Sequence, residues 1–191
     1  MHVLRRVLLI VLAVGIAACD STGEAGPPRS ASILKVTVTD APLVDPVNGD
    51  PWDGGGGGGP EVYFRLFDAS RDYVTDPGAD RLNPRDDLDL VFAQGSTQPW
   101  FDDIDALTFP LVWDVDPGYD VRRLDDELYI ALFDYDPTTG DDPMAASEPF
   151  RLADIAPDIA DGAIDTITLD GVDVTGSPVA FEVRLSVVFE D

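Results

Sequence analysis

Carboxylates are concentrated at two places in the chain, each next to the end of an apolar segment. One group follows the apolar segment 128–133 and comprises Asp134, Asp136, Asp141 and Asp142 within nine residues. Asp134 and Asp136 are two residues apart, so both side chains can turn to one side of an extended backbone. The Pro-Thr-Thr-Gly sequence that follows can reverse the chain and return Asp142 to the cluster.

The other group surrounds a glycine run. Asp45, Asp50 and Asp53 precede Gly54–Gly59, and Glu61 follows it. Ca²⁺ prefers about six to eight hard oxygen ligands, and loops that meet at one end of a β-sandwich can supply them. The two groups therefore predict a Ca²⁺ site, provided that the fold brings their loops together.

Short apolar segments separated by Asp, Gly and Pro are predicted to form the strands that position these loops. Apolar residues alternate with polar ones over 34–38 and, most clearly, over 181–189, as in half-buried strands. Segment 128–133 (LYIALF) is apolar at every position, which indicates a central strand covered on both faces. Further candidate strands are 62–67, 88–92, 107–113 (bent or at an edge because of Pro110) and 164–169.

No segment has a sustained helical period, and 151–160 is expected to hold a helical turn at most. Short strands with turn residues between them and no long helix are typical of the all-β class. We therefore predict an antiparallel eight-stranded β-sandwich.

Composition limits the chemistry that the chain can perform. His2 is the only histidine and Cys19 the only cysteine, so a chain processed before Cys19 has no histidine base, and acylation would consume its thiol. The formal charge is −25, and removing residues 1–18 with their two arginines makes it −27. Such a charge repels nucleic acid and anionic lipid head groups, and we expect neither as a direct partner.

The N-terminus has the features of an export signal. Arg5 and Arg6 precede the aliphatic segment 7–16, which is shorter than the about 20 residues needed to span a bilayer. The sequence Ile-Ala-Ala-Cys ending at Cys19 resembles the bacterial lipobox, in which the signal is cleaved and the cysteine acylated. An ordinary secreted protein is the alternative, but a lone thiol in an oxidising compartment would be a liability.

These features divide the chain into three parts. Residues 1–18 are predicted to be the lipoprotein signal peptide, 19–32 the lipidated cysteine with a flexible polar tether, and 33–191 the β-sandwich. The expected location is the bacterial cell envelope, with the lipid anchor holding the protein on a membrane.

The order of several motifs between residues 33 and 189 resembles the C2 domain family. The first motifs are an opening strand over 34–41, a first calcium loop over 45–52 and a Glu-Val-Tyr-Phe segment from Glu61. A Gln-Pro-Trp second loop follows at 98–100. A strand over 122–136 then enters the third loop, which ends with Asp-Pro-Met at 142–144.

The resemblance implies a C2-like Greek-key sandwich that binds Ca²⁺ through its loops. The ligands that it implies are Asp134, Asp136 and Asp142 of the third loop, with Glu61 and either Asp45 or Asp53 of the first. Binding to anionic lipid is not expected to transfer, because Lys35 is the only lysine and the arginines are dispersed.

We therefore expect a non-catalytic protein whose Ca²⁺-ordered loops bind another component of the envelope. The alternative is a metal-free structural or protein-interaction sandwich in which the acids only solvate the surface. A hydrolase that uses paired carboxylates, such as Asp102 with Asp103 or Asp125 with Asp126, is a third class.

Overall fold

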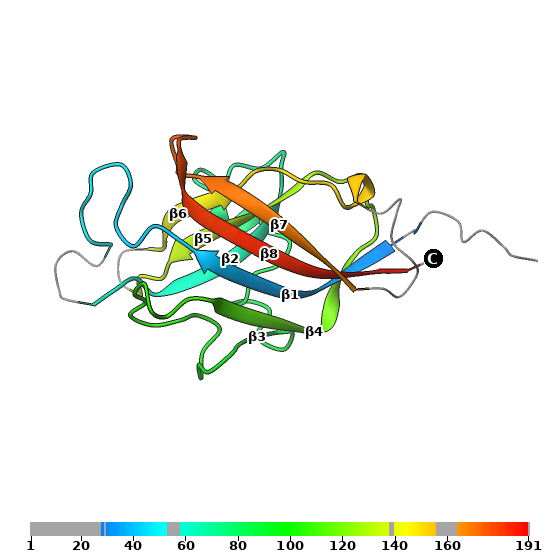
Figure 1. The fold of residues 1–191 in the computed structure, drawn as a ribbon, viewed down its shortest axis with the longest axis horizontal. Coiled ribbons are helices and arrows are strands. Elements are labelled where there is room, and N and C mark those ends of the chain that lie inside the picture. Colours follow the sequence, from blue (N-terminus) through cyan, green and yellow to red (C-terminus); the bar gives the residue numbers. More distant parts are fainter. Residues whose placement is uncertain (1–27, 29, 53–57, 138–139, 156–163, 191) are drawn as a thin grey trace, which may run out of the picture.

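The computed structural model describes residues 28, 30–52, 58–137, 140–155 and 164–190. Eight strands and two single-turn 3₁₀ helices make up the regular structure of this part (Figure 1). All strand pairs are antiparallel, which confirms the predicted all-β class and the eight strands. The elements are β1 (Ser30–Asp40), β2 (Val62–Asp68), η1 (Pro77–Ala79), β3 (Val91–Ala93), β4 (Leu111–Val121), β5 (Leu128–Asp134), β6 (Asp142–Ser147), η2 (Leu152–Asp154), β7 (Ile164–Val172) and β8 (Pro178–Glu190).

The sandwich is a single sheet that curls over itself, with the strand order β2-β5-β6-β7-β8-β1-β4-β3. Figure 1 shows β7, β8 and β1 in front of β2 and β5. The two layers are joined between β6 and β7 by only two residue pairs, Ala146 with Val172 and Ser147 with Gly171. A Cβ atom at Gly171 would lie 2.6 Å from the Ala146 carbonyl oxygen, so the pairing of β6 with β7 needs a glycine at this position.

The main core fills the space between the layers. In β8, the alternating residues from Phe181 to Phe189 are all buried, as their period of two predicts. Phe64 of β2 meets Trp113 of β4 edge to face, with ring centroids 5.3 Å apart, so the contact spans the two layers. Each such side chain contributes about 1.5–3 kcal/mol by leaving water, which makes this interface the main source of stability.

A second, aromatic cluster lies on the outer face of β2 and β5. Tyr63, Phe67, Tyr129 and Phe133 form it, and Tyr73 of the β2–β3 connection packs against them. The Tyr73 amide donates to the Tyr129 hydroxyl at 3.0 Å. Every residue of β5 is consequently buried, as predicted for a central strand.

Several strand boundaries differ from the prediction. β1 begins at Ser30, inside the segment predicted to be tether, because Ala31 is buried and pairs with both β4 and β8. β3 starts only at Val91, since the amides of Leu90 and Val91 both donate to the Asp87 carbonyl in a turn. β4 starts at Leu111, after a turn that is closed by the amide of Thr108.

β6 was not predicted as a strand. Its sequence, DPMAAS, has small residues and a proline instead of an alternating pattern, and its burial comes from the pairing with β5. The helical turn expected within 151–160 is present as η2 in the described part. No helix among the described residues is long and apolar enough to cross a membrane.

The direction of β1 separates the two ends of the sandwich. Ser30 pairs with Glu190, so the first and last described strand residues lie together at one end. Residues 41–52 after β1, residues 135–137 after β5 and the β7–β8 hairpin turn lie at the other end, on the left in Figure 1. We call this second end the loop end.

Candidate functional site

A pocket of about 500 Å³ opens at the loop end. Residues of the segment 45–52 line it, together with the first residues of β6, Asp142 to Met144. Val74 of the β2–β3 connection and Val174 of the β7–β8 turn complete the lining. Four segments that are distant in sequence thus converge on one cavity, and this cavity includes parts of both acidic groups that the sequence singled out.

The segment 45–52 is held in shape by its own hydrogen bonds. The Asp45 amide donates to the Asp50 carbonyl at 2.9 Å, and the Asp45 carboxylate accepts from the Val47 amide at 2.8 Å. Gly49 has a φ of +78°, a conformation that a residue with a side chain rarely adopts. The Trp52 indole donates to the Pro42 carbonyl at 2.9 Å and fixes the end of the loop. The carboxylates of this segment are therefore presented by a structured turn.

Negative charge accumulates around the pocket. Burial, followed by the charges of Asp136, Asp45 and Asp141, raises the pKa of Asp142 above its ordinary value. We name Asp45, Asp50, Asp136 and Asp142 the loop-end acids. Among the described residues, none of them forms an ion pair. The repulsion that Asp142 receives from Asp136 and Asp45 makes the loop end attractive to cations.

Two predicted ligands meet deeper in the fold. Asp134 is fully buried at the end of β5, and its Oδ1 accepts the Glu61 amide at 2.8 Å. The Tyr135 amide donates in turn to the Glu61 carbonyl at 2.7 Å. These bonds join the start of β2 to the end of β5, so Asp134 has a structural role at the base of the loop end.

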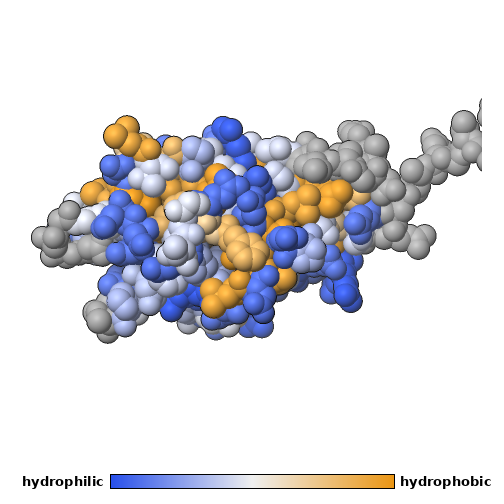
Figure 2. All heavy atoms as spheres, turned by 90° about the horizontal axis from the view of Figure 1, so that it is seen from below, coloured by the Kyte–Doolittle hydropathy of each residue, from blue (hydrophilic) through white to orange (hydrophobic). Residues whose placement is uncertain are grey.

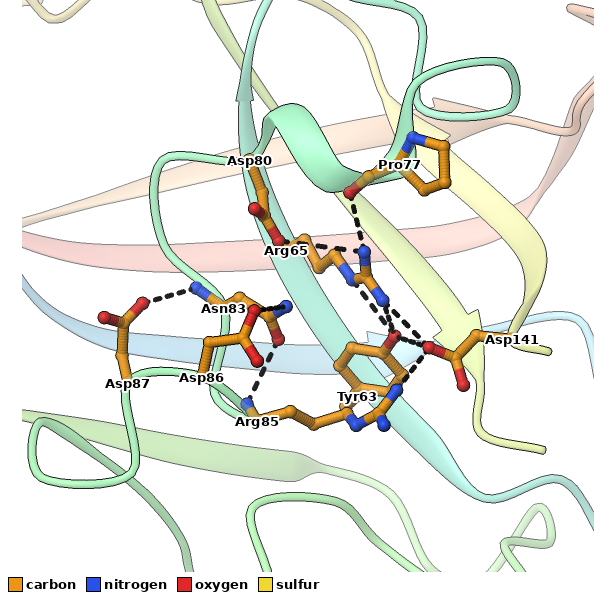
Figure 3. Close-up of polar contacts among 9 residues, drawn as sticks. All are labelled: Tyr63, Arg65, Pro77, Asp80, Asn83, Arg85, Asp86, Asp87 and Asp141. Atoms are coloured by element: carbon orange, nitrogen blue, oxygen red, sulfur yellow. Dashed lines mark hydrogen bonds and ion pairs between the residues drawn. The ribbon is translucent and has the colours of Figure 1, made fainter. Parts of the chain in front are cut away.

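The remaining acid of the third loop, Asp141, is neutralised from within the protein (Figure 3). Arg65 is buried on the outer face of β2 and donates to Asp141 at 2.8 Å, and Arg85 donates to the same carboxylate oxygen. The Tyr63 hydroxyl donates to Asp141 at 2.5 Å, and Asp80 lies 3.7 Å from Arg65. We name these five residues the arginine cluster.

Aromatic rings support the cluster. The Arg65 guanidinium lies 4.5 Å from the centre of the Phe133 ring, and Arg85 lies 4.3 Å from that of Tyr135. Burial is the main cause that raises the pKa of Tyr63, so its hydroxyl keeps its proton and donates. Burial also raises the pKa of Asp80, against the lowering effect of Arg65. The cluster binds the β2–β3 connection to the third loop through charges that the protein itself supplies.

The predicted ligand set is thus divided by the structure. Asp45 and Asp142 line the pocket, Asp136 adds to the same electrostatic field, and Glu61 and Asp134 form the strand junction. Asp53 and Cys19 lie outside the described residues. Carboxylate oxygens are suitable donors for Ca²⁺, but within the described ranges no three acidic side chains converge closely enough to hold a metal ion.

Neither the arginine cluster nor the apolar walls of the pocket were predicted from the sequence. One signal for the cluster was present: Arg65 interrupts the apolar segment VYFRLF. An arginine at such a position must find an anion if the outer face is covered, because an unpaired buried charge is costly.

No family model and no curated protein matches the chain. Among solved structures, it is similar to a C2 domain of plant extended synaptotagmin 1, with 8% identity and a TM-score of 0.37 over 83% of this chain and 95% of that domain. Likeness at this level gives no information about a site.

Proposed function

We propose that the protein is a non-catalytic binding module of the bacterial envelope, anchored by lipid on Cys19, with a C2-like sandwich whose loop end takes up Ca²⁺. The observation that carries this proposal is the contrast in counter-charge. Asp142 lies in the repulsive field of Asp136 and Asp45, and the loop-end acids have no ion-pair partner among the described residues, whereas Asp141 beside them has two arginines. A dication supplied from solution would relieve the repulsion that the fold leaves in place.

The residues that would hold Ca²⁺ are Asp45, Asp136 and Asp142, with Asp53 as a further candidate from the sequence. Their oxygen atoms are hard ligands of the kind that Ca²⁺ prefers. Bound Ca²⁺ would neutralise the loop end, and the segment 45–52 and the start of β6 would then present one surface to a partner in the envelope.

A calorimetric Ca²⁺ titration of the full chain in nonionic detergent, after treatment with chelator, tests this proposal. We expect saturable binding tighter than about 1 mM and a rise in melting temperature. The double variant Asp136→Asn and Asp142→Asn should lose both responses. Asp125→Asn, which removes one carboxylate outside the pocket lining, should keep them. A flat titration with an unchanged melting temperature would rule out the Ca²⁺ function.

The lipid anchor is tested separately. The Cys19→Ser variant, expressed in a bacterium that processes lipoproteins, should move from the membrane fraction to the soluble fraction and lose labelling by a fatty-acid analogue. Retention of the label in this variant would refute attachment at Cys19.

A metal-free interaction module is the second candidate, and the arginine cluster favours it. Arg65 and Arg85 already hold the third loop through Asp141, so this loop does not need a metal for its order. Under this reading the Asp136→Asn and Asp142→Asn double variant has the same melting temperature with Ca²⁺ and with chelator, as does the parent protein.

A further inference from the structure

We propose that the pocket at the loop end receives a basic side chain, arginine or lysine, together with a neighbouring apolar residue of a protein partner. The inference concerns the same end of the sandwich as the proposed Ca²⁺ function, but it rests on the apolar walls of the pocket, which a metal ion does not use.

The lining of the pocket is mixed. Eight of its twelve lining residues are Val, Pro, Met or Trp, and three of the remaining four are Asp45, Asp50 and Asp142. Its volume of about 500 Å³ lies within the range of about 300–1,000 Å³ of pockets that take organic ligands. A bare cation would leave most of this wall in contact with water.

Exposed apolar side chains gather at the same pocket. The described residues include seven exposed large hydrophobic side chains, and Val47, Val74 and Val174 of these line it. Their exposed fractions are 57%, 44% and 38%. They come from three separate segments, so their convergence is a property of the fold, and covering them would be favourable by the hydrophobic effect.

The charge at the pocket selects the class of ligand. Three carboxylates, those of Asp45, Asp50 and Asp142, line it. Arginine and lysine carry a positive head on a long apolar stem, which can lie along a hydrophobic wall while the head pairs with carboxylates. The net charge of −25 would also steer a basic partner toward the molecule and repel anionic lipid.

A second apolar groove lacks this combination of charge and apolar surface. It adjoins β3 and is lined by residues such as Leu88, Phe92 and Gln98, with no charged side chain among its described lining residues. Figure 2, which views the molecule from the side of β3 and β4, shows hydrophobic patches bordered by hydrophilic residues on this face. The lining of that groove does not indicate which ligand would cover it. The lining of the pocket at the loop end, by contrast, favours a ligand that is both positively charged and partly apolar.

The test uses the peptide acetyl-Ala-Leu-Arg-Leu-Ala-amide and its counterpart with citrulline in place of arginine. Each peptide is titrated into the full chain in nonionic detergent, in the presence of chelator. We expect saturable binding of the arginine peptide and binding about tenfold weaker or more for the citrulline peptide, because the charge-assisted hydrogen bonds are lost. Absence of saturable arginine-peptide binding, or equal binding of the two peptides, would overturn the inference.

Two pairs of variants locate the binding. Val47→Ser should weaken the arginine peptide several-fold and leave the Ca²⁺ titration unchanged, while Leu107→Ser, which removes an exposed leucine outside the pocket, should alter neither. Asp50→Asn should weaken the peptide, and Asp125→Asn should not. An unchanged peptide affinity in Val47→Ser would mean non-specific charge attraction and would refute the pocket.

The two proposals fail in different ways. Saturable binding of the arginine peptide with a flat Ca²⁺ titration supports the pocket and rejects the metal. Ca²⁺ binding that is saturable, with no peptide binding in either chelator or Ca²⁺, supports the metal and rejects the pocket.

Discussion

The arginine cluster and the loop-end acids are both rich in carboxylates, but they differ in where their counter-charge comes from. In the cluster, Asp141 receives hydrogen bonds from Arg65, Arg85 and Tyr63 in a largely buried setting. At the loop end, Asp45, Asp50, Asp136 and Asp142 form no ion pair among the described residues. The two regions are adjacent, because Asp141 and Asp142 follow each other in the chain.

This difference indicates which acids serve stability and which are available for binding. Charges that the fold itself neutralises are costly to leave unpaired and have little remaining attraction for a ligand. Charges that the fold leaves in mutual repulsion cost stability, and that cost is recovered only when a cation binds. Carboxylates that lack a counter-charge, at a cost in stability, are expected at functional sites.

The largest expected effect comes from removing the central cation of the arginine cluster. Arg65→Met leaves Asp80 without its cation and Asp141 with Arg85 alone, in surroundings that remain buried. We expect a loss of about 3–5 kcal/mol in the free energy of unfolding, measured by urea denaturation. Arg184→Met, which removes only the exposed pair with Glu182, should change it by less than about 0.5 kcal/mol. Equal urea midpoints for the two variants would show that the cluster is not a stabilising unit.

A smaller effect, dependent on pH, is expected for acids paired at the surface. Arg81 contacts Asp68 and Asp126, and its hydrogen bond is the main cause that lowers the pKa of Asp126. Because the folded-state pKa is below the unfolded one, this stabilisation is present above the ordinary aspartate pKa and is lost as the pH falls through the lowered value. Asp126→Asn should therefore cost up to about 1 kcal/mol at neutral pH.

The measurement is a series of urea midpoints for the parent and Asp126→Asn from pH 7 to pH 2. The two curves should approach each other at the acid end. A difference that stays constant over the whole range would show that the asparagine acts through something other than charge.

The smallest effect, of opposite sign, is expected at the loop end. In chelator and low salt, Asp142→Asn removes a carboxylate that its neighbours repel, so the free energy of unfolding should rise by a few tenths of a kcal/mol. The gain should vanish at 1 M salt, where the Debye length is about 3 Å. Thermal unfolding at the two salt concentrations measures it, and a destabilised variant at low salt would contradict the contrast between the two regions.

Much of the fold was predictable because strands leave a period of two in the sequence. The alternation over 181–189 and the unbroken apolar segment 128–133 correspond to β8 and β5, and both were identified. β6 was not, because a strand of Pro, Met, Ala and Ser is fixed by its neighbours and not by its own pattern. The early start of β1 was missed for the same reason: Ala31 is too small to mark a strand but is buried between β4 and β8.

For the site, the sequence predicted which loops carry carboxylates but not how those carboxylates are arranged. The sequence located the acids at strand ends, yet it treated Asp134, Asp141 and Asp142 as one group, whereas the structure gives them three different environments. Arg65 reaches Asp141 across 76 residues, a contact that no local pattern contains. The apolar walls were likewise invisible, since Val74 and Val174 come from connections that nothing in the sequence links.

The direction of β1 also determines how far the pocket lies from a group attached to the chain before Ser30. β1 has eleven residues, which at about 3.3 Å per residue place its two ends about 35 Å apart. A lipid on a residue before Ser30 would therefore hold the molecule by the end opposite the pocket, and whenever that end faces the bilayer the pocket faces away from it. In that orientation the pocket would bind its ligand on the aqueous side away from the bilayer. The sandwich would then hold the pocket at a distance from the membrane as well as position its loops.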